Sequence, residues 1–434
     1  MRLEFPNRGR LWSIRSCVRG LRLHGMSIKI VFGILRVQYN LKEKDIMMRT
    51  ADAVIIGAGV NGASIAFNLL KQGLKKVVIL EKYLIASGGT GKSAAIVRQH
   101  YSNDPLIRMM KRCIQIFSRF DEVVGGSAGF VNTGWAFLIP QEAADVFSKN
   151  MSRQQSLGIN TREISKNELL DIEPRFNLDD VAKIAYEPES GYADPHLTTT
   201  SYVQAACSLG GEIVQGNPVT SISIEKNRVV QVNTTKGSIS TNIAVNAAGP
   251  WAGKIAEMAG LSIPLQVSRE EEILIAPPPG EPPVRLVVSD MAKAIYYRPD
   301  MSRVLVGRGY PKEYSYVDPD HYTGDTSFEF IEDAARRLAS RIPVFANALV
   351  EHAYTGLYDI TPDWHPVLGR TSVNGFFLAA GFSGHGFKLG PVIGELIAEE
   401  VLTGRASSID ISGFSLERFE KGQLFTAAYG GNRA

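Results

Sequence analysis

The stretch ADAVIIGAGVNG, residues 51–62, decides the fold of this chain. Its first half, Ala51–Ile56, is a short apolar run followed directly by glycine, which is typical of a buried parallel strand. Its second half fits the pattern G-x-G-x-x-G at the start of a helix predicted over residues 61–71. A second apolar run, residues 76–80, completes a strand–helix–strand unit of about thirty residues. The sequence therefore predicts an α/β fold with a Rossmann-like domain.

The glycine loop predicts a dinucleotide site. Gly57 permits the tight turn, Gly59 lets the backbone approach a pyrophosphate, and Gly62 allows the helix to pack closely on the strand. Glu81 ends the second strand 19 residues after Gly62, where its carboxylate can accept hydrogen bonds from an adenosine ribose. An acidic residue there disfavours a 2′-phosphate. The alternative is a purely structural turn.

The rest of the chain predicts a second, sheet-rich domain inserted between pieces of the first. Residues 243–247 and 376–380 are further apolar runs that predict buried strands, each soon followed by glycine. Residues 277–280, PPPG, predict a loop because proline neither donates to a sheet nor continues a helix. Three segments predict antiparallel strands: residues 271–275, 294–298 and 303–306.

Composition excludes several classes of protein. Of the 434 residues, 44% are hydrophobic and 21% charged, which is ordinary for a globular protein. No apolar run approaches the ~20 residues that a membrane span needs, so we expect no transmembrane segment. Cys17, Cys113 and Cys207 are too few and too scattered for a disulfide framework or a zinc site. We therefore predict no metal and a reducing compartment, the cytoplasm.

Residues 1–50 differ from the rest. They carry 11 Lys and Arg against 3 Asp and Glu, whereas the other residues hold 36 basic and 41 acidic groups. The body is thus mildly acidic, which removes any composition argument for a nucleic-acid partner. An Arg-rich leader is typical of an organelle transit peptide, which would place the protein in the mitochondrial matrix. The alternative, which we favour, is that translation starts at Met47 or Met48 and that this extension is non-native or disordered.

Residues 86–93, ASGGTGKS, are similar to a relaxed phosphate-binding loop of nucleoside triphosphatases. Such a loop leaves a buried strand directly and enters a helix. Here the preceding strand ends at Leu80, and residues 83–85 intervene. We therefore interpret the segment as a second contact loop for the same dinucleotide.

Five stretches occur in a characteristic order: the glycine loop with Glu81, and residues 88–101, 246–251 (NAAGPW), 361–369 (TPDWHPVLG) and 381–388 (GFSGHGFK). Together they resemble the FAD-dependent amine oxidoreductases of the D-amino-acid oxidase family. The most similar branch holds sarcosine oxidase in its beta-subunit and monomeric forms, dimethylglycine dehydrogenase and glycine oxidase. The resemblance covers residues 51–404.

This resemblance implies a Rossmann-like FAD-binding domain with an inserted antiparallel-sheet substrate domain. The predicted division gives residues 51–105, 190–255 and 350–405 to the FAD-binding domain, and 106–189 and 256–349 to the substrate domain, with a C-terminal tail at 406–434. It also implies the FAD contacts Gly57, Gly59, Val60, Asn61, Gly62, Glu81, Lys82, Gly91, Lys92, Ser93, Val219, Ala248, Gly249, Trp251, Gly356, Gly384, Gly386, Phe387 and Lys388.

The resemblance also bears on how FAD is held. Monomeric sarcosine oxidase tethers its flavin through a cysteine, and Gly356 stands at the matching position, so we predict non-covalent FAD. His196 lies near the position where the beta subunit of heterotetrameric sarcosine oxidase attaches FMN, although a histidine after proline is usually a turn or helix-start residue. Leu305 or a neighbour stands in place of the lysine that helps monomeric sarcosine oxidase react with oxygen, which favours a dehydrogenase.

Residues 381–386 predict a second glycine-rich turn, followed by a helix from about Pro391 to Leu402. Pro391 suits the first helical turn, where a missing N–H costs little. Because a helix N-terminus carries a partial positive charge, this one would favour a reduced, anionic flavin.

The catalytic candidates are Arg98, Lys388, Tyr358 and His385. By the resemblance, Arg98 and Lys388 would hold a substrate carboxylate, and the alternative for each is a surface ion pair. Tyr358 would line the substrate cavity or be a core aromatic residue. His385 would shape the flavin face or be a turn residue satisfied by the backbone.

The function implied is oxidation of the C–N bond of a small amino acid or N-methyl amino acid (sarcosine, glycine, dimethylglycine or proline class) by hydride transfer to flavin N5. The electron acceptor would be oxygen or another carrier, and the beta-subunit relatives suggest a hetero-oligomer. Two alternatives remain open: oxidation of a 2-hydroxy acid or glycerol phosphate on the same fold, and a non-catalytic flavoprotein subunit.

Overall fold

The computed structural model describes residues 46–429. The predictions of a transit peptide and of a non-native or disordered extension concern residues 1–50, of which residues 1–45 lie outside the described part. The described residues form four sheets, of six, nine, four and two strands.

The predicted nucleotide-binding unit is confirmed as part of the six-stranded sheet, whose strand order is β20-β21-β13-β2-β3-β9. The strands from β21 to β9 are parallel, and β20 is antiparallel to β21. They are β2 (Ala53–Ile56), β3 (Val77–Leu80), β9 (Glu212–Val214), β13 (Ala244–Asn246), β20 (Val367–Arg370) and β21 (Phe376–Ala380). Strands β2, β3, β13 and β21 are buried along their whole length, which explains their continuous apolar sequences.

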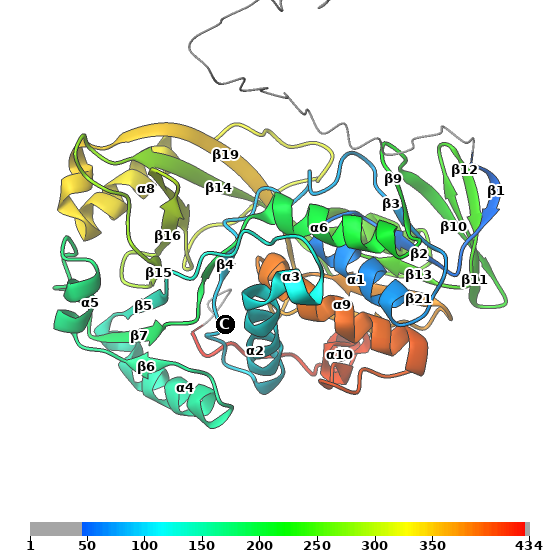
Figure 1. Cartoon of the computed structure of the whole chain (residues 1–434), viewed down its shortest axis with the longest axis horizontal. Helices are drawn as coiled ribbons and strands as arrows, with labels where there is room; N and C mark the ends of the chain where they lie inside the picture. Colours follow the sequence, from blue (N-terminus) through cyan, green and yellow to red (C-terminus); the bar gives the residue numbers. More distant parts are fainter. Residues whose placement is uncertain (1–45, 430–434) are drawn as a thin grey trace, which may run out of the picture. The chain divides into compact units, whose positions relative to one another are not determined.

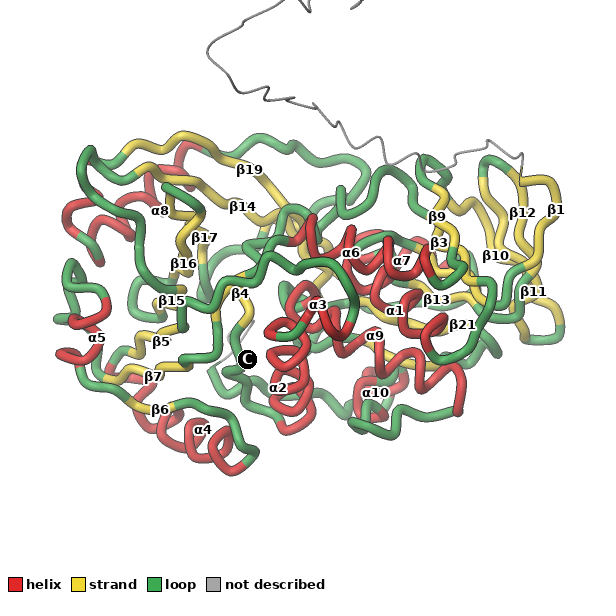
Figure 2. Tube along the Cα trace, viewed as in Figure 1, coloured by secondary structure: helices red, strands yellow, loops and turns green. Residues whose placement is uncertain are grey.

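A helical layer covers this sheet (Figures 1 and 2). Its helices are α1 (Val60–Lys71), α2 (Asp104–Ser118), α6 (Pro195–Ser208) and α9 (Gly386–Thr403). Helix α1 packs against α6 and α9, and α2 packs against α9. The apolar faces of these helices share one buried core with the sheet.

The inserted region forms the nine-stranded sheet, in the order β18-β14-β17-β16-β15-β5-β7-β6, with β19 paired to β14. Its strands are β5 (Trp135–Ile139), β6 (Arg162–Glu163), β7 (Lys183–Glu187), β14 (Gln266–Ala276), β15 (Val287–Asp290), β16 (Ile295–Asp300), β17 (Arg303–Arg308), β18 (Ser315–Tyr316) and β19 (Leu349–Ile360). The three predicted antiparallel strands are therefore confirmed within β14, β16 and β17. Only the β15–β5 pair of this sheet is parallel. Helix α8 (Phe328–Arg341) packs on the sheet through Ala334 and Leu338.

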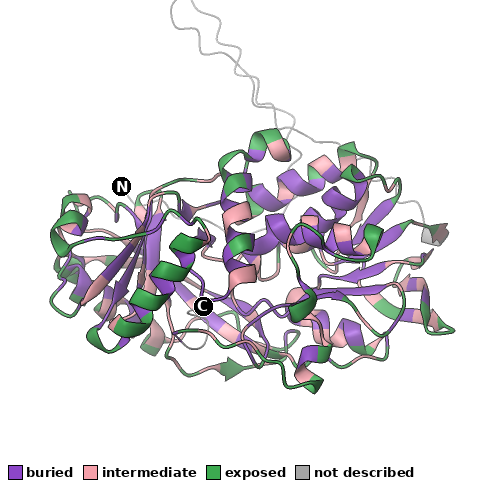
Figure 3. Ribbon diagram, turned by 90° about the horizontal axis from the view of Figure 1, so that it is seen from below, coloured by how far each residue is buried: buried purple, intermediate pink, exposed green. Residues whose placement is uncertain are grey.

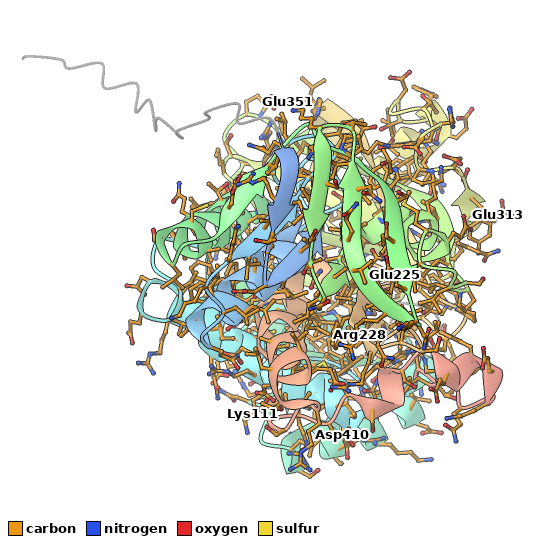
Figure 4. All side chains as sticks on the ribbon, turned by 90° about the vertical axis from the view of Figure 1, so that its right-hand side faces the viewer. Lys111, Glu225, Arg228, Glu313, Glu351 and Asp410 are labelled. Carbon is orange, nitrogen blue, oxygen red and sulfur yellow. The ribbon has the colours of Figure 1, made fainter. Side chains whose placement is uncertain are left out.

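A four-stranded sheet adjoins the first, in the order β1-β12-β11-β10: β1 (Ile46–Thr50), β10 (Val219–Glu225), β11 (Arg228–Thr234) and β12 (Gly237–Ser240). Figure 4 looks onto this sheet and labels Glu225 and Arg228, which flank the β10–β11 turn. The turn residues Lys226 and Asn227 both have positive φ, as the tight hairpin requires. The extension predicted to end at residue 50 therefore ends earlier, because β1 pairs with β12.

Further elements lie outside these three sheets and the helical layer. They are β4 (Ile96–Val97) paired with β8 (Gly191–Tyr192), and helices α3 (Phe120–Val123), α4 (Ala144–Ser156), α5 (Lys166–Ile172), α7 (Ala252–Glu257) and α10 (Glu417–Glu420). Figure 3 shows the buried strands inside both regions and the exposed outer faces of the helices.

One predicted element is wrong in position. Helix α9 begins at Gly386, so Pro391 lies inside the helix and not in its first turn. Proline removes only one helix hydrogen bond, and Pro391 is buried in close packing, where the hydroxyl of Ser64 donates to its carbonyl at 3.3 Å. The helix N-terminus therefore lies inside the glycine-rich turn itself.

Candidate functional site

A cavity of ≈ 270 Å³ lies at the carboxyl ends of the parallel strands. Fifteen of the predicted FAD contacts border it: Gly57, Gly59, Asn61, Glu81, Lys82, Lys92, Ser93, Val219, Ala248, Gly249, Trp251, Gly356, Gly384, Gly386 and Phe387. Val60, Gly62, Gly91 and Lys388 do not border it. We call it the cofactor cavity.

The glycine loop has the geometry that its sequence predicts. Gly57 has a φ of +108°, and a Cβ there would lie 2.5 Å from the carbonyl oxygen of Ala247. A Cβ on Gly62 would lie 2.0 Å from the Gly57 oxygen, so this glycine lets α1 start directly against the turn. The backbone of α1 is therefore close to any ligand in the cavity, and its N-terminus carries no side-chain cap.

Glu81 is held in place by the loops around it. Its Oε2 accepts the N–H of Ala58 at 2.8 Å, and its Oε1 accepts the N–H of Tyr83 at 2.8 Å. An ionised carboxylate has about four acceptor positions, so two bonds leave capacity for ribose hydroxyls. The predicted role of Glu81 is compatible with this geometry.

The cavity fits a polar dinucleotide. Two buried polar atoms on its wall, Asn61 Oδ1 and Asn217 Nδ2, have no hydrogen-bond partner. Buried polar groups are normally satisfied, so these two atoms are suited to hydrogen-bond a polar ligand in the cavity. Sequence reasoning missed Asn217 because it follows a short strand without a motif.

Residues 86–93 do not form a triphosphate-binding loop. No helix follows them, and Ala86, Ser87, Gly88, Gly89 and Thr90 all border the cofactor cavity. The Thr90 hydroxyl accepts the N–H of Val60 at 3.2 Å, which ties this segment to the start of α1. The segment forms part of the cavity wall, and its contact with a dinucleotide stays a prediction.

A segment of the inserted region closes the cavity from the opposite side. Asp320, which follows β18, accepts the indole N–H of Trp251 at 2.7 Å and the ammonium of Lys254 at 2.8 Å. Lys82 forms a further ion pair with the same carboxylate. These contacts, which lower the pKa of Asp320, join the two sheets across the cavity.

A second cavity of ≈ 110 Å³ adjoins the first, and we call it the substrate cavity. Ser93, Tyr358, Gly384 and Phe387 border both cavities. All four catalytic candidates border the substrate cavity: Arg98, Lys388, Tyr358 and His385. No sequence motif predicts the apolar and aromatic remainder of the wall, which includes Trp135, Phe137, Met291, Tyr296 and Tyr310.

Arg98 and Lys388 are buried cations and not surface ion pairs. Each is 8% exposed. Arg98 donates to the carbonyl of His100, and its guanidinium lies 4.8 Å from the ring centroid of Tyr101. Burial, and then the nearby charge of Arg98, hold the pKa of Lys388 well below its usual value.

A buried polar cluster stands behind Arg98. Glu187 accepts the N–H of Gln99 at 2.8 Å and the hydroxyl of Ser190 at 2.7 Å. Burial raises the pKa of Glu187 to about 7, against the opposing effect of these hydrogen bonds and of the Arg98 charge. Sequence reasoning missed Glu187, which is distant from every motif.

The C-terminal segment reaches the same cluster. The hydroxyl of Tyr429 lies 3.2 Å from His100 Nε2, and the Phe137 and Tyr429 rings are 5.4 Å apart. Residues 406–429, predicted as a tail, thus contribute a side chain behind the substrate cavity.

The positions discussed for covalent attachment are also placed. Gly356 borders the cofactor cavity beside Lys92, and a Cβ on it would lie 3.3 Å from the Lys92 Cβ. His196 is exposed, packs against Gly91 and borders neither cavity. Leu305, which was discussed as standing in place of an oxygen-reactive lysine, is buried and also borders neither cavity.

A dinucleotide cavity on a Rossmann-like sheet, joined to a small cationic cavity, defines a dinucleotide-dependent oxidoreductase. Residues 52–400 match the family model described as DAO, FAD dependent oxidoreductase, and the chain belongs to this family. The predicted family and fold class are thereby confirmed.

The chain is similar to several characterised proteins. It is 30% identical to L-proline dehydrogenase from P. horikoshii, with a TM-score of 0.81 over 87% of this chain and 100% of that one. It is 29% identical to mitochondrial sarcosine dehydrogenase of Homo sapiens over 85% of this chain, but spans only 41% of that protein. It is 27% identical to sarcosine oxidase subunit beta of Rhodobacter capsulatus over 86% of this chain and 89% of that one.

No helix of residues 46–429 is long and apolar enough to cross a membrane. No group of three or more His, Cys, Asp or Glu side chains within this range is placed to hold a metal ion.

Proposed function

We propose that this protein oxidises the C–N bond of a small amino acid or N-methyl amino acid with FAD as cofactor. The observation that carries the proposal is the pair of buried cations, Arg98 and Lys388, in a small cavity that shares its wall with the cofactor cavity. The names of the relatives, sarcosine dehydrogenase, sarcosine oxidase subunit beta and L-proline dehydrogenase, support the same substrate class.

When bound, FAD supplies the acceptor for a hydride that leaves the carbon next to the amine nitrogen. The residues bordering the cofactor cavity would hold its ADP part, with Glu81 on the ribose and the start of α1 at the phosphates. The N-terminus of α9 lies at the junction of the two cavities, has no acidic residue in its first turn, and favours negative charge there.

Arg98 and Lys388 would orient the substrate through its carboxylate. Arginine can bind a carboxylate through two parallel hydrogen bonds, and lysine adds a point charge. Both cations also lower the pKa of the substrate amine, because like charges disfavour its protonated form. A neutral amine can release hydride, and water then hydrolyses the imine product.

Three finer features are part of the proposal. FAD is held non-covalently, because glycine at position 356 offers no thiol. Further subunits assemble with this chain, as the similarity to a beta subunit suggests. The domain boundaries follow the two cores, which would move α2 from the predicted substrate piece (106–189) to the FAD-binding domain. The cytoplasmic location stays a prediction.

The test is anaerobic mixing of the FAD-loaded protein with a panel of substrates. We expect sarcosine, glycine, dimethylglycine or proline to bleach the flavin, while 2-hydroxy acids and glycerol phosphate do not. Bleaching by a hydroxy acid alone would overturn the substrate class. A protein that no amine reduces unless another subunit is added would favour a flavoprotein subunit.

The mode of FAD attachment is tested separately. Acid precipitation of the holoprotein should release all flavin into the supernatant. A yellow pellet would contradict non-covalent binding.

A further inference from the structure

A buried carboxylate in the wall between the cavities accepts hydrogen bonds from two tyrosine hydroxyls. Glu272 on β14 is 5% exposed. The hydroxyl of Tyr296 on β16 donates to its Oε1 at 2.8 Å, and the hydroxyl of Tyr354 on β19 donates to its Oε2. Because each oxygen accepts one hydroxyl, this is the arrangement of an ionised carboxylate.

The three residues connect different environments. Tyr296 borders the substrate cavity, Glu272 borders the cofactor cavity, and Tyr354 is half-buried on the long strand β19. Beyond Tyr354, the ring of the exposed His352 lies stacked at 6.0 Å. Two hydrogen bonds therefore link Tyr296 at the substrate cavity, through Glu272, to the half-buried Tyr354.

Other charged groups act on Glu272. Arg298 on β16 favours the ionised form of Glu272. Glu270, which lies on β14 as Glu272 does, disfavours that form. Glu270 is itself ion-paired with Lys312. Burial raises the pKa of Glu272, and its bonds from Tyr296 and Tyr354 oppose that effect. The pKa of Glu272 is therefore raised by burial, while two hydroxyls and the Arg298 charge stabilise its ionised form.

We propose that Tyr296, Glu272 and Tyr354 form the path by which the substrate ammonium loses its proton. The inference rests on the proposed function, because an amino acid binds as an ammonium and must become a neutral amine before it can release hydride. The ammonium N–H bond breaks and its proton passes to the Tyr296 oxygen, while the Tyr296 O–H proton passes to Glu272. The Tyr354 hydroxyl then turns from Glu272 to a water molecule, gives that water its O–H proton and takes the proton of Glu272 on its oxygen, and no electrons are transferred in these steps.

The first experiment uses a ligand that cannot be oxidised. 2-Aminoisobutyrate carries no hydrogen on the carbon next to its nitrogen, so its binding is separated from flavin reduction. Binding is followed by the flavin spectrum and proton release by a pH indicator in the same stopped-flow trace. In the wild type, proton release should keep pace with binding. In E272Q and Y296F it should lag by about tenfold or more, with the same final amount.

The second experiment uses the amine that bleaches the flavin and follows flavin reduction from about pH 6 to 10. Such an amine titrates over roughly this range. In E272Q and Y296F the reduction should become biphasic below the pKa of the amine. A slow phase limited by proton loss should show a solvent deuterium effect, and the deficit should shrink as the pH rises.

Tyr297 provides the matched control. It is the next residue on β16 and is fully buried, whereas Tyr296 is partly buried; its hydroxyl has no hydrogen-bond partner, and it packs in the core of the nine-stranded sheet. Y297F should leave both kinetic readouts unchanged. FAD content and the unfolding midpoint of every variant identify any loss that is merely structural.

Three outcomes would overturn the inference. Faster reduction of E272Q at low pH would mean that Glu272 acts only as a negative charge that raises the pKa of the amine. Absence of proton release in the wild type would mean that the proton stays in the site, for example on Lys388. Unchanged release kinetics in E272Q would remove Glu272 from the path. Failure of the proposed function would appear differently, as a wild-type flavin that no amine bleaches.

Discussion

Arg98 and Lys388 border the same buried cavity, and neither forms a salt bridge with a carboxylate of residues 46–429. Two buried cations that lack such a partner are costly, because each loses hydration and repels the other. The pKa of Lys388 is lowered for these two reasons, burial and the charge of Arg98. A ligand carboxylate would relieve this cost, and the first two predictions follow from this relationship.

Binding of a simple carboxylate should weaken as the pH rises. The pKa of Lys388 is lowered in the empty cavity and rises when a carboxylate binds, so binding takes up a proton between these two pKa values. Within that window the affinity falls by up to tenfold per pH unit. Acetate titrations of the holoprotein from about pH 6 upward, where carboxylates are ionised, measure this slope. K388M should remove the slope, and a wild-type affinity independent of pH would contradict the assignment.

Replacing Arg98 should weaken carboxylate binding without loss of FAD. R98M removes a charge-assisted donor pair, and we expect a loss of about 10- to 100-fold in acetate affinity, with R98K intermediate because it keeps the charge but not the planar fork. FAD content should stay at the wild-type ratio. The control is R112M, because Arg112 is paired with Glu395 on α9 and borders neither cavity. Equal loss of FAD and acetate binding in R98M would show that Arg98 only stabilises the fold.

Asp320 should control how long FAD stays bound. Its carboxylate joins Trp251, Lys82 and Lys254 across the cofactor cavity, so D320N should speed FAD dissociation several-fold, most strongly at low salt. The pKa of Asp320 is lowered in the folded protein, so this contribution is present above its unfolded pKa and is lost on acidification. Dilution into excess apo-flavoprotein acceptor measures the dissociation rate. D325N, in the same segment but away from the cavity, is the control. An unchanged rate in D320N would mean that this closure does not retain the cofactor.

Local sequence rules were sufficient for the glycine loop and Glu81 at the cofactor cavity, but not for Asn217. Gly57, Gly62 and Glu81 follow from backbone geometry within one strand–helix–strand unit, where spacing along the chain determines position in space. The start of α9 was predicted wrongly because proline prefers the first helical turn, whereas close packing holds Pro391 inside this helix.

The polar wall of the substrate cavity could not be predicted in this way. Tyr296, Glu272 and Tyr354 come from three strands and meet only because of the register of β14 with its neighbours, in which Glu272 lies opposite Tyr354. Glu187 and Tyr429 likewise reach the Arg98 cluster from distant segments. Strand register depends on the whole sheet, and no local pattern in one sequence determines it.

The buried pair Arg418–Asp363 should account for a large part of the stability of the C-terminal segment. Arg418 donates to both carboxylate oxygens of Asp363, at 2.8 and 2.9 Å, with side chains 1% and 0% exposed. R418M would leave the carboxylate buried without its counter-charge, at a cost of about 3–5 kcal/mol in the free energy of unfolding. Because the pKa of Asp363 is lowered in the folded protein, the wild type should lose this stabilisation as the pH falls through that lowered value.

Denaturant unfolding of the holoprotein measures the loss. R119M is the control, since Arg119 forms an exposed pair with Glu122, and no measurable change is expected there. The double variant R418M/D363L replaces both charges by apolar groups and should recover much of the stability lost in R418M. If R418M unfolds at the wild-type denaturant concentration, the pair does not hold the C-terminal segment, and the buried Phe414 together with the contact of Tyr429 with His100 would position it.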